Sequence, residues 1–283
     1  MTGPKSYAQA GVSLETAEAV VERLRTAVES TGARGFGAFA GLHPLDDGRL
    51  LAASTDGVGT KLILARERGR LRDCGADLAA HCINDVITTG ATPLMLLDYV
   101  AAAEIRLEEV AELVEGAAAV CRDAGVALVG GETAELPGIY REGELDFAGT
   151  CVGIVERGEL LDGAGITAGD EVIGFPSAGV HANGFTLVRR VLEDEDYDGE
   201  DLLAPTKLYL GDAQALRGRA KALAHVTGGG RRSGGALRRR RSRSRRSTRP
   251  RHGAAPRRRR RPRGRPPRAR SFPARRSGSG SRV

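Results

Sequence analysis

The chain has 283 residues and a formal net charge of +7, a length that suits one large domain or two of ordinary size. The charge is unevenly distributed. Of the 43 Lys and Arg residues, 23 are arginines that follow residue 230, where no Asp or Glu occurs, so residues 1–230 carry a net charge of −16. So acidic a body repels nucleic acid and anionic membrane surfaces.

Composition excludes further classes of protein. No apolar run approaches the roughly 18 residues that a membrane helix needs. The first residues show neither an apolar export core nor an Arg-rich amphipathic helix, so we expect no membrane partner and a cytoplasmic location. The four cysteines lie far apart without a Cys-x-x-Cys pair. We therefore predict buried free thiols rather than a zinc site or a disulfide framework.

Hydrophobic periodicity and glycine-rich breaks predict the secondary structure. Ser13 is the expected cap of the first helix. The predicted elements, in chain order, are a helix at 14–30, a strand at 50–54, a helix at 77–89, a strand at 93–101, a helix from Leu107 that ends at Gly125, a short strand at 126–129 before a glycine-rich turn, a strand at 147–155, a joint at 158–170, a strand at 171–175, a turn at 176–184 and a helix at 185–193. Strands that alternate with helices predict an α/β fold, with one lobe over 1–160 and a partial second lobe over 161–230.

The segment Thr55-Asp56-Gly57-Val58-Gly59-Thr60-Lys61 follows a predicted strand. Two glycines allow backbone N–H groups to approach an anion closely, Asp56 can hold a divalent cation, and Lys61 adds a positive charge for phosphate. This combination suits a nucleotide site. A tight turn with a solvated Asp and Lys fits the same sequence.

Three further segments place polar groups where ligands bind in α/β proteins. Asn84 and Asp85 lie in a largely apolar helix, where a carboxylate is costly unless it is paired, bound to metal or hydrogen-bonded locally. Glu132 follows a strand, at the edge of a sheet. The turn at 177–184 precedes a helix and forms a natural phosphate cradle, although a lone histidine there is more often structural. Its polar and glycine positions are Ser177, Gly179, His181 and Asn183.

Together these segments resemble the aminoimidazole ribonucleotide synthetase family, the phosphoribosylformylglycinamidine cyclo-ligases of purine biosynthesis. The matching blocks follow the family order across some 225 residues. They are YAQAGVS from Tyr7, FGAFAGL from Phe36, STDGVGTKL from Ser54, DLAAHCINDVITTGATPLMLLDY from Asp77, LVGGETAELPGIY from Leu128, DFAGTCVGIVE from Asp146, SAGVHANGFTLVRRVL from Ser177, LLAPTKLY from Leu202 and HVTGGG from His225. Two departures are His81, where the family commonly shows Met, and SAGVHAN in place of SSG-x-HSN.

The resemblance implies a two-lobed α/β fold of an ATP-using superfamily and a homodimer whose amino-terminal lobes join their sheets. The implied reaction converts formylglycinamidine ribonucleotide and ATP into aminoimidazole ribonucleotide, ADP and phosphate. ATP phosphorylates the formamide oxygen, and the amidine nitrogen then closes the ring and expels phosphate. Holding both reacting ends together contributes up to roughly 7 to 11 kcal/mol in well-oriented cases.

The resemblance also implies roles for the candidate residues. Mg²⁺ and ATP phosphates are assigned to Asp56, Asp85 and Glu132, with Thr60 and Asn84 in the same cofactor site. Lys61 and the backbone of Gly57 and Gly59 steady the transferred charge. The substrate phosphate, or a proton donated as the ring forms, is assigned to His181 with its neighbours Ser177, Gly179 and Asn183.

The resemblance stops at Gly230, and residues 231–283 are almost only Arg, Ser, Pro, Gly and Ala. Such a composition cannot build a core, so we expect disorder. One interpretation of the tail is a frameshift in a GC-rich gene, and a truncated, inactive ligase is then an alternative to the active enzyme. A genuine arginine-rich arm that binds nucleic acid is the alternative function. A kinase or selenophosphate synthetase of the same superfamily also stays open, although the latter is expected to carry a cysteine before Cys74.

Overall fold

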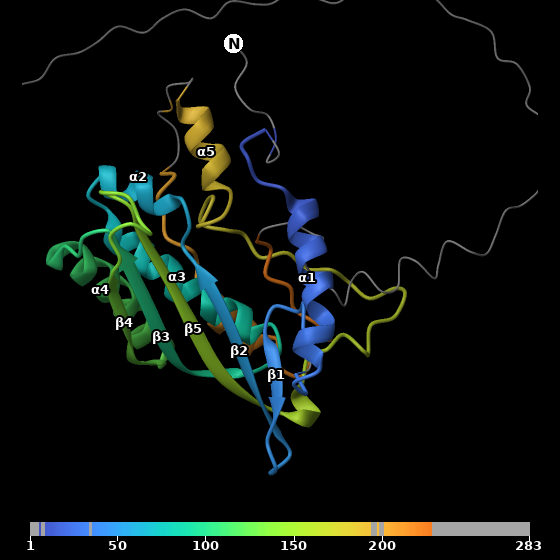
Figure 1. The fold of residues 1–283 in the computed structure, drawn as a ribbon. Coiled ribbons are helices and arrows are strands. Elements are labelled where there is room, and N and C mark those ends of the chain that lie inside the picture. Colours follow the sequence, from blue (N-terminus) through green and yellow to red (C-terminus); the bar gives the residue numbers. More distant parts are fainter. Residues whose placement is uncertain (1–5, 7–8, 34–35, 194–196, 198–200, 228–283) are drawn as a thin grey trace, which may run out of the picture. The chain divides into compact units, whose positions relative to one another are not determined.

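The computed structural model describes residues 6, 9–33, 36–193, 197 and 201–227 (Figure 1). The predictions for residues 231–283 therefore lie outside the described residues. The elements are α1 (Leu14–Glu29), β1 (Gly41–Pro44), β2 (Arg49–Gly57), α2 (Lys61–Glu67), α3 (Leu71–Ile87), β3 (Thr92–Ala102), α4 (Leu107–Ala124), β4 (Ala127–Glu135), β5 (Leu145–Glu156), a short 3₁₀ turn (Arg157–Glu159), α5 (Phe185–Leu192) and α6 (Leu210–Ala215).

The strands form one five-stranded sheet in the order β1-β2-β5-β3-β4 (Figure 1). Only β3 and β4 are parallel, and the other neighbours are antiparallel. Along β5, buried residues alternate with half-buried ones, as expected of a strand with one covered face. The mixture of this sheet with helices confirms the predicted α/β class.

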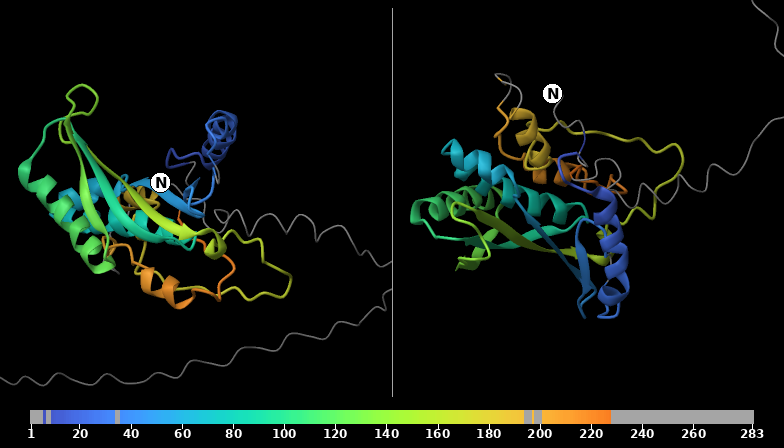
Figure 2. Two further views of the ribbon diagram at one scale, coloured as in Figure 1. Left: turned by 90° about the horizontal axis from the view of Figure 1, so that it is seen from below. Right: turned by 45° about the horizontal axis from the view of Figure 1, so that its top comes forward.

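Helices α3 and α4 cover one face of the sheet (Figure 2). Glycines on β5 permit the close approach of α3. A Cβ atom on Gly149 would lie 3.1 Å from Leu78 Cδ2, and one on Gly153 would lie 2.7 Å from Val86 Cγ1. The core between these layers includes Phe147, which is fully buried.

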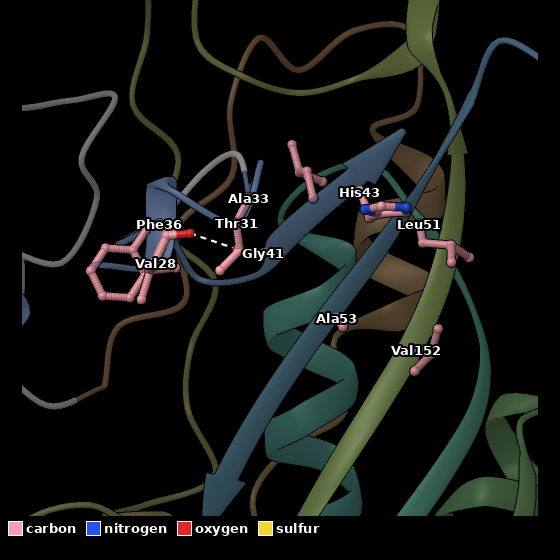
Figure 3. Close-up of a pocket in the computed structure, with 10 residues that line it drawn as sticks. Val28, Thr31, Ala33, Phe36, Gly41, His43, Leu51, Ala53 and Val152 are labelled. Carbon is pink, nitrogen blue, oxygen red and sulfur yellow. Dashed lines mark hydrogen bonds between the residues drawn. The ribbon is translucent and has the colours of Figure 1, made fainter. Parts of the chain in front are cut away.

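The opposite face of the sheet is open over much of its area within the described chain. Met95 and Leu97 on β3 are 36% and 40% exposed. Near the edge strand β1, the end of α1 and the sheet enclose a shallow hollow of about 380 Å³ (Figure 3). Its lining is largely apolar and comprises Val28, Thr31, Ala33, Phe36, Gly41, Leu42, His43, Leu51, Ala53 and Val152.

Several local predictions are confirmed. Ser13 Oγ accepts a hydrogen bond from Thr16 N at 3.1 Å and caps α1. All four cysteines are free and buried, and burial raises the pKa of Cys121 to about 11 and that of Cys151 to about 12. No helix among the described residues is long and apolar enough to cross a membrane.

Several predictions differ from the structure. The strand expected at 50–54 extends over Arg49–Gly57, so Asp56 lies within β2 and not in a turn after it, and the helix expected at 77–89 begins earlier, at Leu71.

Two further differences concern strands. The strand expected at 171–175 is wrong: that segment pairs with no described strand, and Val172 is 83% exposed. Its apolar pattern suits a strand, but a strand forms only where a neighbour completes its hydrogen bonds. The turn predicted after 126–129 is instead the continuation of β4, because parallel pairing with β3 runs on as far as Ala102 and Glu135.

Candidate functional site

A row of polar side chains runs along α3. Asp77, His81 and Asp85 are spaced four residues apart, a spacing that places side chains on one face of a helix, and Asn84 lies beside them. All four residues are buried. This face meets the end of β2 and parts of the chain after residue 180, as the contacts below show. Polar groups here need partners, because an unpaired buried polar group costs about 1–3 kcal/mol.

Asp56 stands near the end of β2 and points to the helix-covered face. Its register partner on β5 is Gly149, whose position faces Leu78 of α3. Asp56 Oδ2 lies 3.1 Å from His81 Nε2, and Oδ1 accepts from Gly57 N at 2.7 Å. The Asp56 side chain is 37% exposed, whereas that of His81 is 3% exposed. Asp56 is therefore a carboxylate that a ligand from solvent can reach.

Asp85 is the buried counterpart of Asp56. Its Oδ2 accepts from Ser54 Oγ at 3.1 Å, and its Oδ1 lies 2.8 Å from His225 Nδ1. The rings of His225 and His81 meet edge-on, with centroids 4.8 Å apart. Burial lowers the pKa of His81, while the Asp56 carboxylate opposes the shift. The structure thus brings Asp56 and Asp85 to one cluster, joined by two histidines.

The cluster fits Mg²⁺ only in part. Mg²⁺ in nucleotide sites is held by one or two carboxylates together with phosphates and water. Asp56 meets this requirement because it is exposed. Both oxygens of Asp85 already have protein partners, and no group of three or more His, Cys, Asp and Glu side chains in the described part of the chain is arranged to hold a metal ion. Joint ligation by Asp56 and Asp85 stays a prediction.

His181 lies at the border of this cluster. Its backbone is in the left-handed region, with φ of 61°. The ring atom Nε2 accepts from Ala178 N at 3.1 Å and from Lys207 N at 3.4 Å, so a neutral ring carries its proton on Nδ1. Burial is the main reason that the pKa of His181 falls to about 4, and the charge of His225 adds to the shift.

The neighbours of His181 differ in their placement. Asn183 Nδ2 lies 3.5 Å from His81 Nε2, which connects the predicted substrate cradle to the cluster. Ser177 is exposed, and Gly179 is half-buried with φ of 141°. The structure therefore connects Asn183 to Asp56 through His81 and leaves Ser177 exposed to solvent.

Lys61 is fully buried. Its Nζ lies 2.6 Å from Asp77 Oδ2 and donates to Ala204 O at 3.1 Å. Burial raises the pKa of Asp77, and the Lys61 ammonium opposes this shift. In the same region Thr60 Oγ1 lies 3.0 Å from Thr186 Oγ1. The ammonium that was expected to face phosphate is thus engaged by the protein itself, and its phosphate role stays a prediction.

Asn84 is likewise engaged with the backbone. Its Nδ2 donates to Lys207 O at 2.9 Å, and its Oδ1 accepts from Tyr209 N at 2.9 Å. The turn after β2 differs in part. Gly57 N and Val58 N donate to Asp56 Oδ1 and Phe147 O, whereas Gly59 is exposed with φ of 70° and its backbone is open to a ligand.

Glu132 is not part of the cluster. It lies on β4 opposite Tyr99 of β3. Asp56, Gly149 and Asp98 are paired with one another across β2, β5 and β3, and the pair of Tyr99 and Glu132 is one residue further along the sheet. Adjacent rows point to opposite faces, and three strand spacings of about 4.8 Å separate β2 from β4. Glu132 is exposed.

Sequence reasoning assigned no role to several residues of this site. His225 appeared only within a matching block, and Ser54, Asp77 and Thr206 were not singled out. One signal was present: the four-residue spacing of Asp77, His81 and Asp85 marks a polar stripe on an otherwise apolar helix. The partners of that stripe lie far away in sequence and have no local signature.

Two family models match the chain. The AIR synthase related protein N-terminal domain matches residues 37–155, and the C-terminal domain of the same family matches residues 167–233. Among solved structures, that of AaThiL complexed with AMPPCP and TMP superposes with a TM-score of 0.54 at 18% identity, covering 70% of this chain and 62% of that one. Thiamine monophosphate kinase from Aquifex aeolicus gives a TM-score of 0.53 at 18% identity, over 75% of this chain and 68% of that one. These two likenesses concern the fold.

Curated relatives are more similar in sequence. The phosphoribosylformylglycinamidine cyclo-ligase of Synechococcus sp. (strain CC9605) is 48% identical over 246 residues, which cover 79% of this chain and 71% of the relative. That of Myxococcus xanthus (strain DK1622) is 44% identical over 248 residues, with 80% and 72% covered. The chain belongs to the phosphoribosylformylglycinamidine cyclo-ligase family of enzymes.

Proposed function

We propose that this chain uses ATP to close the imidazole ring of aminoimidazole ribonucleotide. The identity of 48% with a named cyclo-ligase is the observation that carries the proposal. The exposed Asp56 carboxylate beside the open backbone of Gly59 supports it. A further support is that a protein of the same fold, AaThiL, was solved with the nucleotide analogue AMPPCP.

In the proposed reaction the formamide oxygen attacks the γ-phosphorus of ATP and ADP leaves. The amidine nitrogen of the same substrate then attacks the activated carbon, the carbon–oxygen bond breaks, and phosphate and a proton depart. This sequence demands charge stabilisation and positioning more than covalent help from the protein. Asp56 and the backbone around Gly59 hold the triphosphate end. His181 and Asn183 hold the ribonucleotide.

Mg²⁺, when bound with ATP, neutralises phosphate charge. Asp56 is the residue that we assign to it, with Asp85 behind it as a buried support through His225 and His81. A homodimer joined through the open sheet face is part of the proposal, because apolar side chains such as Met95 and Leu97 stand exposed there. The cytoplasmic location expected from the composition also stays a proposal.

The Asp56→Asn variant tests the proposal. We expect ATP-dependent ring closure to fall by about 10² to 10³-fold, the scale seen when one group aimed at developing charge is removed. The neutral amide keeps the size of the side chain and can still accept from Gly57 N, so the thermal midpoint should stay close to that of the parent. Product formation and ADP release are measured together.

The matched control is Asp47→Asn, because Asp47 is an exposed carboxylate that pairs with Arg49. We expect full activity from this variant. An Asp56→Asn protein that retains most of its turnover would refute the assignment of Asp56, and a parent chain without ring closure would refute the proposed function itself.

A further inference from the structure

The segment 201–209 belongs to no helix or strand of the described chain, yet it is well packed. Leu203 is 1% exposed and Thr206 is 5% exposed. Buried backbone N–H and C=O groups require hydrogen-bond partners. Within the segment Ala204 N donates to Asp201 O at 3.1 Å, and further partners come from side chains of α2 and α3.

The first anchor is the buried ion pair of Lys61 and Asp77. Lys61 Nζ donates to Ala204 O at 3.1 Å. Asp77 Oδ1 accepts from both Thr206 N and Thr206 Oγ1, at 2.8 Å and 2.7 Å. The two charges neutralise each other at 2.6 Å, and both side chains are fully buried. The pair therefore binds two points of the segment.

The second anchor is Asn84. Its amide donates to Lys207 O and accepts from Tyr209 N, both at 2.9 Å. This pattern imitates the two hydrogen bonds that a neighbouring strand would make. The backbone N–H of Lys207, just before these two contacts, donates to His181 Nε2 at 3.4 Å. The Tyr209 ring also lies 6.4 Å from the His181 ring, centroid to centroid.

We propose that Lys61, Asp77 and Asn84 are positioning residues for the ring-closing site. They dock the segment 204–209 on α2 and α3, and the docked segment places the His181 ring beside the cluster of Asp56 and His81. The docking stands on the contacts alone, whereas its catalytic consequence rests on the proposed function. Lys61 and Asn84, which the sequence analysis assigned to the phosphate and cofactor sites, thereby act by holding the backbone of the segment 204–209 in place.

If the Lys61–Asp77 pair only stabilised the fold, replacing it with apolar residues would not release the segment 204–209. A double variant distinguishes this structural role from docking. Replacing a buried ion pair with apolar residues of similar size is often neutral for stability. In the K61M/D77L variant, Ala204 O and Thr206 N lose their partners although no charge is left unpaired. Asn84→Ala removes the second anchor without any change in charge.

Hydrogen exchange of the full chain, followed by mass spectrometry on peptides over 203–210, tests the docking. We expect amide exchange in this segment to be at least about tenfold faster in both K61M/D77L and Asn84→Ala than in the parent. Thermal unfolding of each variant checks that it is still folded at the temperature of the exchange measurement. Arg72→Gln is the control on α3, since its exposed ion pair with Glu115 touches no part of the segment. Unchanged exchange in both variants overturns the inference whatever the activity.

Steady-state kinetics test the catalytic consequence of the docking, which is the placement of the His181 ring. We expect the KM for formylglycinamidine ribonucleotide to rise about tenfold in both variants while the KM for ATP changes by less than about twofold. Equal effects on both substrates, or none, would overturn the placing of His181. A parent chain that shows no ring closure would refute the proposed function, while faster exchange in the variants would still support the docking.

Discussion

At the scale of single residues, His181 combines two unusual properties. It adopts a left-handed backbone, which is uncommon for residues other than glycine, although histidine, like asparagine and aspartate, adopts it more often than most. Its Nε2 accepts hydrogen bonds from two backbone amides, and these bonds hold the ring neutral and fixed. Strained positions held in this way gather at functional sites, which agrees with the role that we propose for this histidine.

The lowered pKa of His181 predicts a pH effect on stability. Because the pKa falls from its ordinary 6.5 to about 4, the unfolded chain binds more protons than the folded one between these values. The free energy of unfolding should therefore decrease as the pH falls through this window. Between pH 7.5 and 5.5 the loss from this group is about 1 kcal/mol, measured as a shift of the urea midpoint.

The variant His181→Asn isolates the contribution of the imidazole. Asparagine tolerates the left-handed backbone and does not titrate in this range. We expect a shallower dependence of the urea midpoint on pH in this variant than in the parent. Identical pH dependence in both proteins would show that the imidazole of His181 is not the group that titrates.

At the scale of elements, the contact between α3 and α4 depends on two glycines. A Cβ atom on Gly75 would lie 2.0 Å from Leu113 O, and one on Gly116 would lie 2.0 Å from Arg72 O. The two helix backbones touch where each has no side chain. This close packing places α3, and with it the polar stripe of Asp77, His81 and Asp85, at a fixed distance behind the sheet.

Gly75→Ala and Gly116→Ala should each destabilise the fold by about 1 to 3 kcal/mol or more, since an added methyl group meets rigid backbone. Thermal or urea unfolding measures the effect. Gly211→Ala in α6 is the control, because nothing lies within 4 Å of its Cβ position, and alanine favours a helix over glycine. Loss of stability in the control alone would contradict this description of the helix pair.

At the scale of the whole molecule, apolar surface remains on the face of the sheet away from α3. Besides Met95 and Leu97, Val20 and Leu24 of α1 are about half exposed, at 50% and 47%. Both residues lie on the apolar face of α1, which the helical periodicity of the sequence predicts to be buried. Large exposed apolar patches mark interfaces, and a second copy of this chain is the occupant that we propose for the exposed face of the sheet.

Light scattering after size exclusion tests the dimer. We expect the parent chain to be dimeric at micromolar concentration and Leu97→Lys to raise the dissociation constant by about tenfold or more, because a charge is then buried at the interface. Val172→Lys is the control, since Val172 is 83% exposed and lies outside the sheet. A monomeric parent chain would refute the dimer.

The sequence by itself determined the local features and the family. Helix periodicity, the Ser13 cap and the burial of the cysteines follow from residue types and their spacing, which act over a few positions. The motif order indicated the cyclo-ligase family and drew attention to Asp56 and Asp85. It also predicted a strand at 171–175 from its composition, although a strand depends on a neighbour that composition does not specify.

Only the tertiary structure decided what each polar group touches. Asp85 meets Ser54 across 31 positions and His225 across 140, and Lys61 reaches Ala204 across 143. A local pattern can state that a buried charge needs a partner, but it cannot name one that distant. For this reason the sequence predicted that Lys61 and Asn84 bind a ligand. In the folded chain both side chains instead form hydrogen bonds with the backbone of the segment 204–209.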